Sequence, residues 1–165
     1  MEEPAVTAGR GDALSRLVAT LTCPPVTALV LGEAGIGKTH LLAEIGRRAR
    51  QAGMRVLAGR ARDFGGGIAY ASLIEALSPL REDPGARARL HALLEAIDEA
   101  ALGGPAGAPA VLAVRLLESL PEPTLIVIDD AHLADADTLS VLGYLTRRVP
   151  RLSVVAAARR PCALD

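Results

Sequence analysis

The chain has 165 residues, which suits one domain of ordinary size and is too short for two. Half of the residues are hydrophobic and 22% are charged, which excludes a disordered chain. The formal net charge is -1, which excludes an overall positive electrostatic field that would attract nucleic acid or anionic lipid. No apolar run approaches the ~20 residues that cross a bilayer, and the first residues lack the basic start of a signal peptide. We therefore expect a cytoplasmic protein, with Cys23 and Cys162 as unrelated reduced thiols.

The first third of the chain alternates between helical and extended patterns. Apolar residues at helical spacing predict a helix over residues 10–20, with Asp12 placed to cap it. After two prolines, residues 26–31 form a short, apolar, β-branched run, which predicts a strand buried on both faces. A glycine-rich turn leads from this run into a predicted helix over residues 38–51, and residues 54–58 are the next strand candidate.

The same alternation continues to the end of the chain. Three glycines at residues 65–67 predict a loop, and residues 103–109 form a linker too short to separate two domains. The remaining predicted elements are helices over residues 71–80, 86–101, 110–120 and 138–148 and strands over residues 125–128 and 152–157. Strands that alternate with helices predict an α/β domain, spanning 1–165, with a parallel sheet covered on both faces.

The turn after the first predicted strand fits the pattern G-x-x-x-x-G-K-[ST] of the Walker A phosphate-binding loop. Its residues are Gly32, Glu33, Ala34, Gly35, Ile36, Gly37, Lys38 and Thr39. Glycines allow the backbone to curl so that successive N–H groups cradle phosphate oxygens, and the following helix adds its positive N-terminal end. The motif therefore predicts a nucleotide-binding site.

The only lysine among 18 basic residues lies in this loop, where a compact ammonium is needed. We expect Lys38 to reach the β- and γ-phosphates and the Thr39 hydroxyl to ligate Mg²⁺. We also include His40, the next helical residue, among the nucleotide-binding positions, with a surface histidine as the alternative.

A second motif follows the third predicted strand, where the apolar run of residues 125–128 ends in two aspartates. A carboxylate at the carboxyl end of a parallel strand lies at the crevice where such sheets bind ligands. This Walker B pattern predicts that Asp129 holds Mg²⁺ through water and that Asp130 polarises the attacking water. A helix cap or turn is the alternative for each aspartate.

Three further segments resemble known ATPases. The sequence GRGDAL at residues 9–14 resembles the opening that precedes the P-loop in STAND-type ATPases of the AAA-like superfamily. Gly59-Arg60, with the glycines of 65–67 and Tyr70, looks like their GR…GG…Y region. The sequence DDAHLADA at residues 129–136 is similar to the continuation of Walker B in the ATPase domain of large LuxR-type transcriptional regulators.

This resemblance implies further site residues. It implies that Gly9 and Arg10 lie near the adenine and that Arg159, with Arg160 as the alternative, senses the γ-phosphate at the end of the fourth strand. Family members often carry Thr or Ser just before the sensor arginine, whereas this chain has alanines. The resemblance also implies a three-layer P-loop fold with strand order 1-4-3-2, its fifth strand missing and the first strand left as an edge.

The resemblance therefore implies a Mg²⁺-dependent ATP-binding module that hydrolyses slowly and acts as a nucleotide switch. We expect it to be the N-terminal ATPase portion of a longer signalling or transcriptional regulator, with an output domain or a second copy as partner. Nothing in the sequence predicts a direct contact with nucleic acid or a membrane. A P-loop kinase of small molecules and a binding fragment without turnover are the alternatives.

Overall fold

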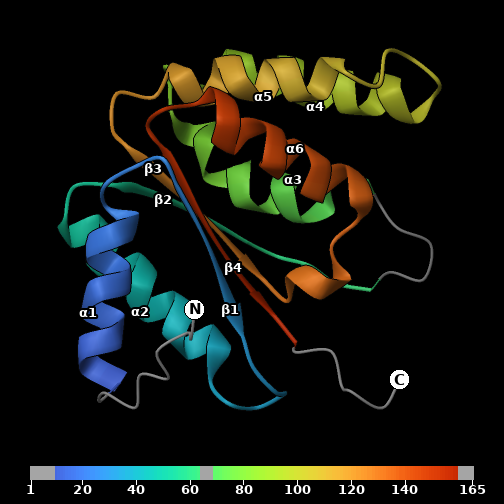
Figure 1. Ribbon diagram of the computed structural model, residues 1–165. Helices are drawn as coiled ribbons and strands as arrows, with labels where there is room; N and C mark the ends of the chain where they lie inside the picture. Colours follow the sequence, from blue (N-terminus) through green and yellow to red (C-terminus); the bar gives the residue numbers. More distant parts are fainter. Residues whose placement is uncertain (1–9, 64–68, 160–165) are drawn as a thin grey trace.

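The computed structural model describes residues 10–63 and 69–159 and places a four-stranded parallel sheet at the centre (Figure 1). The order across the sheet is β1-β4-β3-β2, which confirms the predicted order 1-4-3-2. Its strands are β1 (Val26–Leu31), β2 (Arg55–Arg60), β3 (Thr124–Asp129) and β4 (Leu152–Ala158). All pairings are parallel, so the carboxyl ends of the strands meet at one edge.

Helices cover both faces of this sheet, as the alternating pattern predicted (Figure 1). One face carries α1 (Arg10–Leu21) and α2 (Lys38–Gln51), and the other carries α3 (Ala71–Leu77) and α6 (Ala136–Arg148). The antiparallel pair α4 (Arg87–Ala101) and α5 (Ala108–Glu118) forms an outer layer over α3 and α6. Two short 3-10 helices, which the sequence did not predict, are η1 (Ser78–Glu82) and η2 (Ala131–Leu133).

The central strand β3 is buried along its whole length. Leu125 and Val127 pack into the apolar cluster under α1 and α2, while Ile126 and Ile128 pack into the larger cluster under the other helices. Side chains alternate between the two faces of a strand, so only a strand covered on both sides is apolar at every position. The strand predicted over residues 125–128 is confirmed, and it is buried on both faces.

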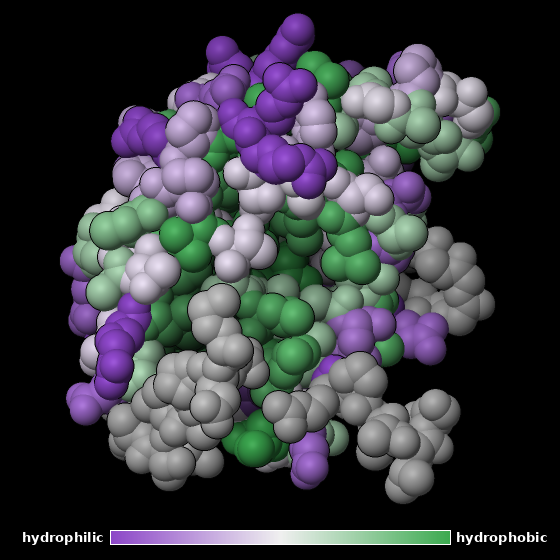
Figure 2. All heavy atoms as spheres, in the orientation of Figure 1, coloured by the Kyte–Doolittle hydropathy of each residue, from purple (hydrophilic) through white to green (hydrophobic). Residues whose placement is uncertain are grey.

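Strand β1 differs from the burial predicted for residues 26–31, because it is not buried on both faces. It is the outer strand of the sheet, and only the side chains that face α1 and α2 are partly covered. On the other face Leu29 is 58% exposed and Leu31 is 48% exposed. Apolar surface gathers in the middle of the corresponding side of the molecule, where β1 and β4 lie (Figure 2).

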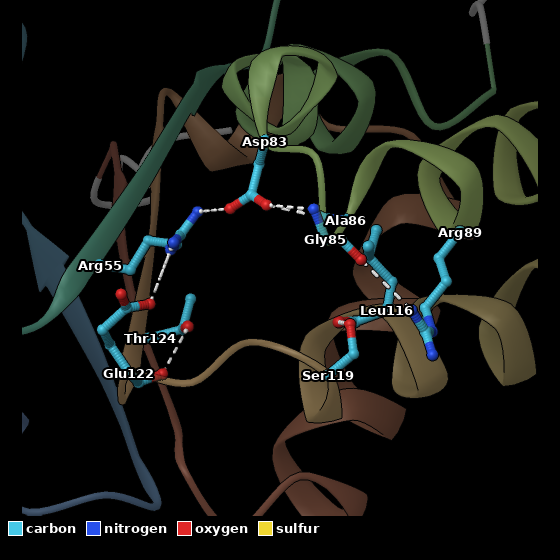
Figure 3. A network of polar contacts seen from close by, with 9 residues as sticks. All are labelled: Arg55, Asp83, Gly85, Ala86, Arg89, Leu116, Ser119, Glu122 and Thr124. Atoms are coloured by element: carbon cyan, nitrogen blue, oxygen red, sulfur yellow. Dashed lines mark hydrogen bonds and ion pairs between the residues drawn. The ribbon is translucent and has the colours of Figure 1, made fainter.

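The amino ends of β2 and β3 are joined to the outer helices by an ion-pair network (Figure 3). Arg55 donates from Nη1 to Asp83 Oδ2 at 2.6 Å and from Nε to Glu122 Oε2 at 3.0 Å. Asp83 Oδ1 also accepts from the backbone N–H groups of Gly85 and Ala86, just before α4. The Arg55 guanidinium lowers the pKa of both carboxyls. This network lies at the edge of the sheet opposite the predicted nucleotide site.

Several boundaries differ from the predicted ones. Helix α1 begins at Arg10, so Asp12 lies inside its first turn and does not cap it. Strand β2 runs to Arg60, two residues beyond the prediction. A Cβ at Gly59 would lie 2.1 Å from the Ser72 carbonyl oxygen, so only glycine allows α3 to pack this closely on β2.

The glycine loop at residues 65–67 and Cys162 fall outside the described residues, and Cys23 is a free, exposed thiol. None of the described helices is both long enough and apolar enough to span a bilayer.

Candidate nucleotide site

The predicted phosphate loop lies between the end of β1 and the start of α2. Gly35 has a φ of +77° and Gly37 a φ of +94°, a region in which residues with a side chain are strained. Gly37 is also the N-cap of α2, and no side chain caps this helix end. The first N–H groups of a helix have no partner within the helix, so this end can bind an anion.

Lys38 is the charged group of this loop and is buried, with 9% of its surface exposed. Its Nζ donates to the carbonyl oxygens of Gly32 and Glu33, each at 2.7 Å. A buried ammonium must be hydrogen-bonded, and here its partners are two neutral carbonyl groups and no carboxylate. The positive charge of Lys38 therefore remains available to an anion held by the loop.

The two predicted metal ligands are brought together although 90 positions separate them in the sequence. The Thr39 hydroxyl donates to Asp129 Oδ2 at 2.7 Å, and Asp129 Oδ1 accepts from the backbone N–H of Asp130 at 2.9 Å. Both are hard oxygen donors, and Mg²⁺ typically takes one or two protein ligands beside phosphates and waters. Within residues 10–63 and 69–159 no cluster of three or more His, Cys, Asp or Glu could hold a metal. The pair thus fits Mg²⁺ bound together with a nucleotide.

Asp130 follows directly and is held by a residue that the sequence did not single out as a site residue. Both Nε and Nη2 of Arg60 donate to Asp130 Oδ2, at 3.0 and 2.8 Å. This hydrogen-bonded carboxylate, together with the charge of Asp129, raises the pKa of Arg60. Asp130 itself has a φ of +51°, which is uncommon for a residue other than glycine. The available sequence signal was the resemblance of Gly59-Arg60 to the GR segment of related ATPases, and only the register of β2 with β3 places Arg60 opposite Asp129.

A second turn with a positive φ lies beside the Walker B strand. Tyr70 has a φ of +62°, and its backbone N–H donates to Asp135 Oδ1 at 3.1 Å. Asp135 caps α6 by accepting from the backbone N–H and the hydroxyl of Thr138, each at 2.7 Å. Burial works to raise the pKa of Asp135, but the bonds from Thr138 and Tyr70 outweigh it and lower the pKa. Asp135 therefore fixes the start of α3 relative to the start of α6.

Two cavities adjoin the loop, one on each side of α2. The larger, about 480 Å³, lies between α1, β1 and α2 and is lined mostly by apolar side chains, among them Leu14, Leu17 and Ile36. The smaller, about 180 Å³, lies between α2 and the strands β2 and β3 and is bordered by Thr39 and Asp129. The first can accept an apolar ring, and the second adjoins the candidate metal ligands.

The remaining predicted residues lie around this site. His40 is exposed and lines the larger cavity. Arg159 is exposed and directly follows β4, at the same edge of the sheet as the loop. Arg10 begins α1, whereas Gly9 and Arg160 lie outside the described residues.

Solved structures share this fold at low sequence identity. One similar structure is that of a DNA replication initiation factor, which is 18% identical, with a TM-score of 0.50. The match covers 98% of this chain and 42% of that one. Drosophila ORC bound to AT-rich DNA and Cdc6 is 13% identical, with a TM-score of 0.56, and covers 92% of this chain and 46% of that one. The ORC2 protein of Aeropyrum pernix, solved in ADPNP and ADP complexes, is 17% identical, with a TM-score of 0.50. The match covers 95% of this chain and 42% of that one.

The chain spans less than half the length of these structures. No curated relative matches the chain in sequence. The family model described as AAA ATPase domain matches residues 7–156, which include the loop, both aspartates, the strands β1, β2 and β3 and most of β4. The chain therefore belongs to the AAA ATPase domain family.

Proposed function

We propose that the chain binds Mg²⁺ and ATP at its phosphate loop, hydrolyses the β–γ anhydride slowly and works as a nucleotide switch in a signalling or transcriptional regulator. The observation that carries this proposal is the contact between Thr39 Oγ1 and Asp129 Oδ2 at 2.7 Å. It joins the Walker A loop to the Walker B strand, although the two motifs lie far apart in the sequence.

The phosphates would lie against the N-terminus of α2, where Gly35 and Gly37 adopt the positive φ values that let a loop curl around an anion. Lys38 would exchange its two carbonyl partners for phosphate oxygens, which offer a negative charge instead of a neutral dipole. Thr39 and Asp129 would hold Mg²⁺. When bound, this ion neutralises charge that develops on the phosphate oxygens.

The larger cavity is the proposed place of the adenine. Its apolar walls come from α1, β1 and Ile36, and an aromatic base gains from burial against such side chains. The family resemblance assigns Gly9 and Arg10 to the same region, and Arg10 begins the helix that lines this cavity. His40, at the rim, would contact the nucleotide from α2.

Turnover would depend on Asp130. The two bonds from Arg60 go to Oδ2, so Oδ1 is free of hydrogen bonds from the described residues. Oδ1 can therefore accept a hydrogen bond from the attacking water and orient it toward the phosphate. Arg60 would act as a positioning residue for that carboxylate, and Arg159, from the end of β4, would read the γ-phosphate.

The regulatory part of the proposal rests on the motif DDAHLADA, which resembles the continuation of Walker B in large LuxR-type regulators. Asp135 in this motif caps α6 and also bonds Tyr70, so the segment that follows the Walker B aspartates is joined to α3. A change at Asp130 can thereby reach two helices on one face of the sheet. We propose that such a change biases an attached output domain or an association between copies, in the cytoplasm.

Calorimetric titration of Mg²⁺ and ATP onto the purified chain tests the binding step. We expect wild type to bind and Lys38→Ala to lose at least about 100-fold in affinity, because a charge-assisted contact to phosphate is removed. Arg151→Ala is the matched control, since Arg151 is exposed and adjoins the amino end of β4, at the opposite edge of the sheet. A folded wild-type chain that does not bind, or a Lys38→Ala chain that binds equally, would overturn the proposal.

A further inference from the structure

Helix α4 carries its charges in the unfavourable order for a helix. Its first turn holds Arg87 and Arg89 and no acidic residue, and its last turns hold Asp98 and Glu99 and no basic residue. The dipole of a helix favours acids at the N-terminus and bases at the C-terminus. Helix α6 follows that rule, with an acid in its first turn and arginines in its last. The reversed order of α4 therefore costs stability in the isolated chain.

The charges of α4 also form a regular exposed stripe. Arg87, His91, Glu95 and Glu99 recur every four residues, which places them along one side of the helix. All four are exposed, whereas Leu90, Leu93 and Ile97 are buried on the opposite side of α4. His91 Nδ1 lies 3.2 Å from Glu95 Oε1, and their side chains are 73% and 64% exposed.

Neither end of this stripe is neutralised within the part of the chain that the structure describes. Arg87 donates to the Arg81 carbonyl at 2.8 Å and Arg89 to the Gly85 carbonyl at 3.2 Å, both neutral acceptors (Figure 3 draws the second bond). The segment that returns past the acidic end, residues 102–114, contains no charged residue. Among the described ion pairs, only the contact of His91 with Glu95 involves the acidic end.

The stripe is complementary to itself when it is read in the opposite direction. Arg87 lies four residues before His91, and Glu99 lies four residues after Glu95. In an antiparallel pair of α4 helices, Arg87 of each copy lies opposite Glu99 of the other, and His91 opposite Glu95. A two-fold axis repeats each contact, as an isologous interface requires. We propose that this face of α4 is the docking surface for a second copy of the chain.

The charges favour a second copy over other partners. A polyanion would be attracted to the end with Arg87 but repelled by Glu95 and Glu99. A basic peptide would be attracted to Glu95 and Glu99 but repelled by Arg87. Only a partner with the same order of charges, laid antiparallel, matches both ends. Because exposed ion pairs are individually weak and are screened by salt, the association is weak and requires low ionic strength.

Sedimentation equilibrium of the full chain in about 50 mM salt is the first test, a concentration at which exposed pairs are only partly screened. We expect a dimer whose dissociation constant rises at least about tenfold in about 500 mM salt. Arg87→Glu makes both ends of the stripe acidic, and Glu95→Arg/Glu99→Arg makes both ends basic, while His91 stays in place. Each variant alone is expected to be monomeric, whereas an equal mixture of the two forms a heterodimer.

Each variant removes the unfavourable charge at one end of α4, Arg87→Glu at the N-terminus and Glu95→Arg/Glu99→Arg at the C-terminus. Both should therefore fold at least as stably as wild type, which thermal unfolding by circular dichroism checks. Arg151→Glu makes the same charge change outside the stripe and should dimerise like wild type. The proposal is overturned if wild type stays monomeric in low salt, if Arg87→Glu dimerises as wild type does, or if the mixture stays monomeric. Binding of wild type to an oligonucleotide through Arg87, without a dimer, would assign the basic end to a polyanion and overturn it too.

Discussion

The two sides of the candidate nucleotide site are held together in different ways. On the phosphate side, Lys38 is buried and its ammonium bonds to carbonyl groups of its own loop. On the acidic side, the Asp130 carboxylate is held by Arg60, whose side chain is 52% exposed and belongs to another strand. The first side is built by consecutive residues, and the second depends on the register of neighbouring strands.

This difference separates the expected effects of substitutions. A change in the loop removes a contact to the phosphates and should weaken nucleotide binding directly. A change at Asp130 or Arg60 leaves the loop and Lys38 intact, because no described hydrogen bond joins them. It should therefore lower turnover and preserve affinity. The following predictions test that separation, starting from the largest effect.

The conservative change Lys38→Arg should reduce the affinity for Mg²⁺ and ATP by about 100-fold, since a planar guanidinium cannot replace a compact ammonium at this point. The Lys38 ammonium donates to the carbonyl oxygens of Gly32 and Glu33, each at 2.7 Å, and a planar guanidinium cannot make both contacts from the same point. Calorimetry on the folded variant measures the change. Affinity equal to wild type would mean that the buried ammonium does not contact the nucleotide.

The change Asp130→Ala should lower the single-turnover rate of phosphate release by about 100-fold while affinity changes little, in line with the loss of a group that orients water. Asp130→Asn is the matched variant, because it keeps the side-chain size and removes the charge. If both variants release phosphate at the wild-type rate, Asp130 has no catalytic role. Wild type without any phosphate release would favour the alternative of a binding module without turnover.

The change Arg60→Gln should lower the same rate by a smaller factor, about tenfold, because Asp130 stays in place but loses its charged partner. Arg60→Lys, which keeps the charge, should restore part of the rate. Arg62→Gln is the control, since Arg62 is a neighbouring exposed arginine that pairs with Glu75 instead. Loss of affinity in Arg60→Gln with an unchanged rate would contradict the separation of the two sides.

The smallest effect is expected at Asp135, which stabilises α6 and α3 without lining either cavity. Asp135→Ala should cost about 1 kcal/mol of unfolding free energy at pH 7, the usual value of an N-cap. The folded state lowers the pKa of Asp135, so its contribution is complete above the ordinary carboxyl range and is lost as the pH falls through the lowered pKa.

Urea unfolding at a series of pH values measures this contribution. The difference between wild type and Asp135→Ala should shrink as the pH falls below about 4, because the Asp135 carboxyl of the unfolded chain then takes up a proton while that of the folded chain still resists it. A difference that stays constant down to the acid limit would mean that the Asp135 charge does not stabilise the cap. Thr138→Ala, which removes one of the two Thr138 bonds, is the companion variant.

The two strands that carry the motifs show what could be predicted and what could not. Both β1 and β3 are short apolar runs. The apolar pattern of β1 predicted burial on both faces, although the family resemblance made it an edge strand. Only β3 is buried on both faces, because it lies between two strands and under helices on both sides. Burial depends on the neighbours that a strand acquires in the sheet, and its own composition does not contain that information.

By itself, the sequence determined the alternation of strands and helices, the phosphate loop and the position of the two aspartates after a strand. Those features depend on local periodicity and on residues within one turn of each other. Only the tertiary structure decided that Thr39 contacts Asp129, that Arg60 holds Asp130 and that Tyr70 bonds to Asp135. Each of these contacts joins segments far apart in the chain, and strand register and helix packing alone set their distance.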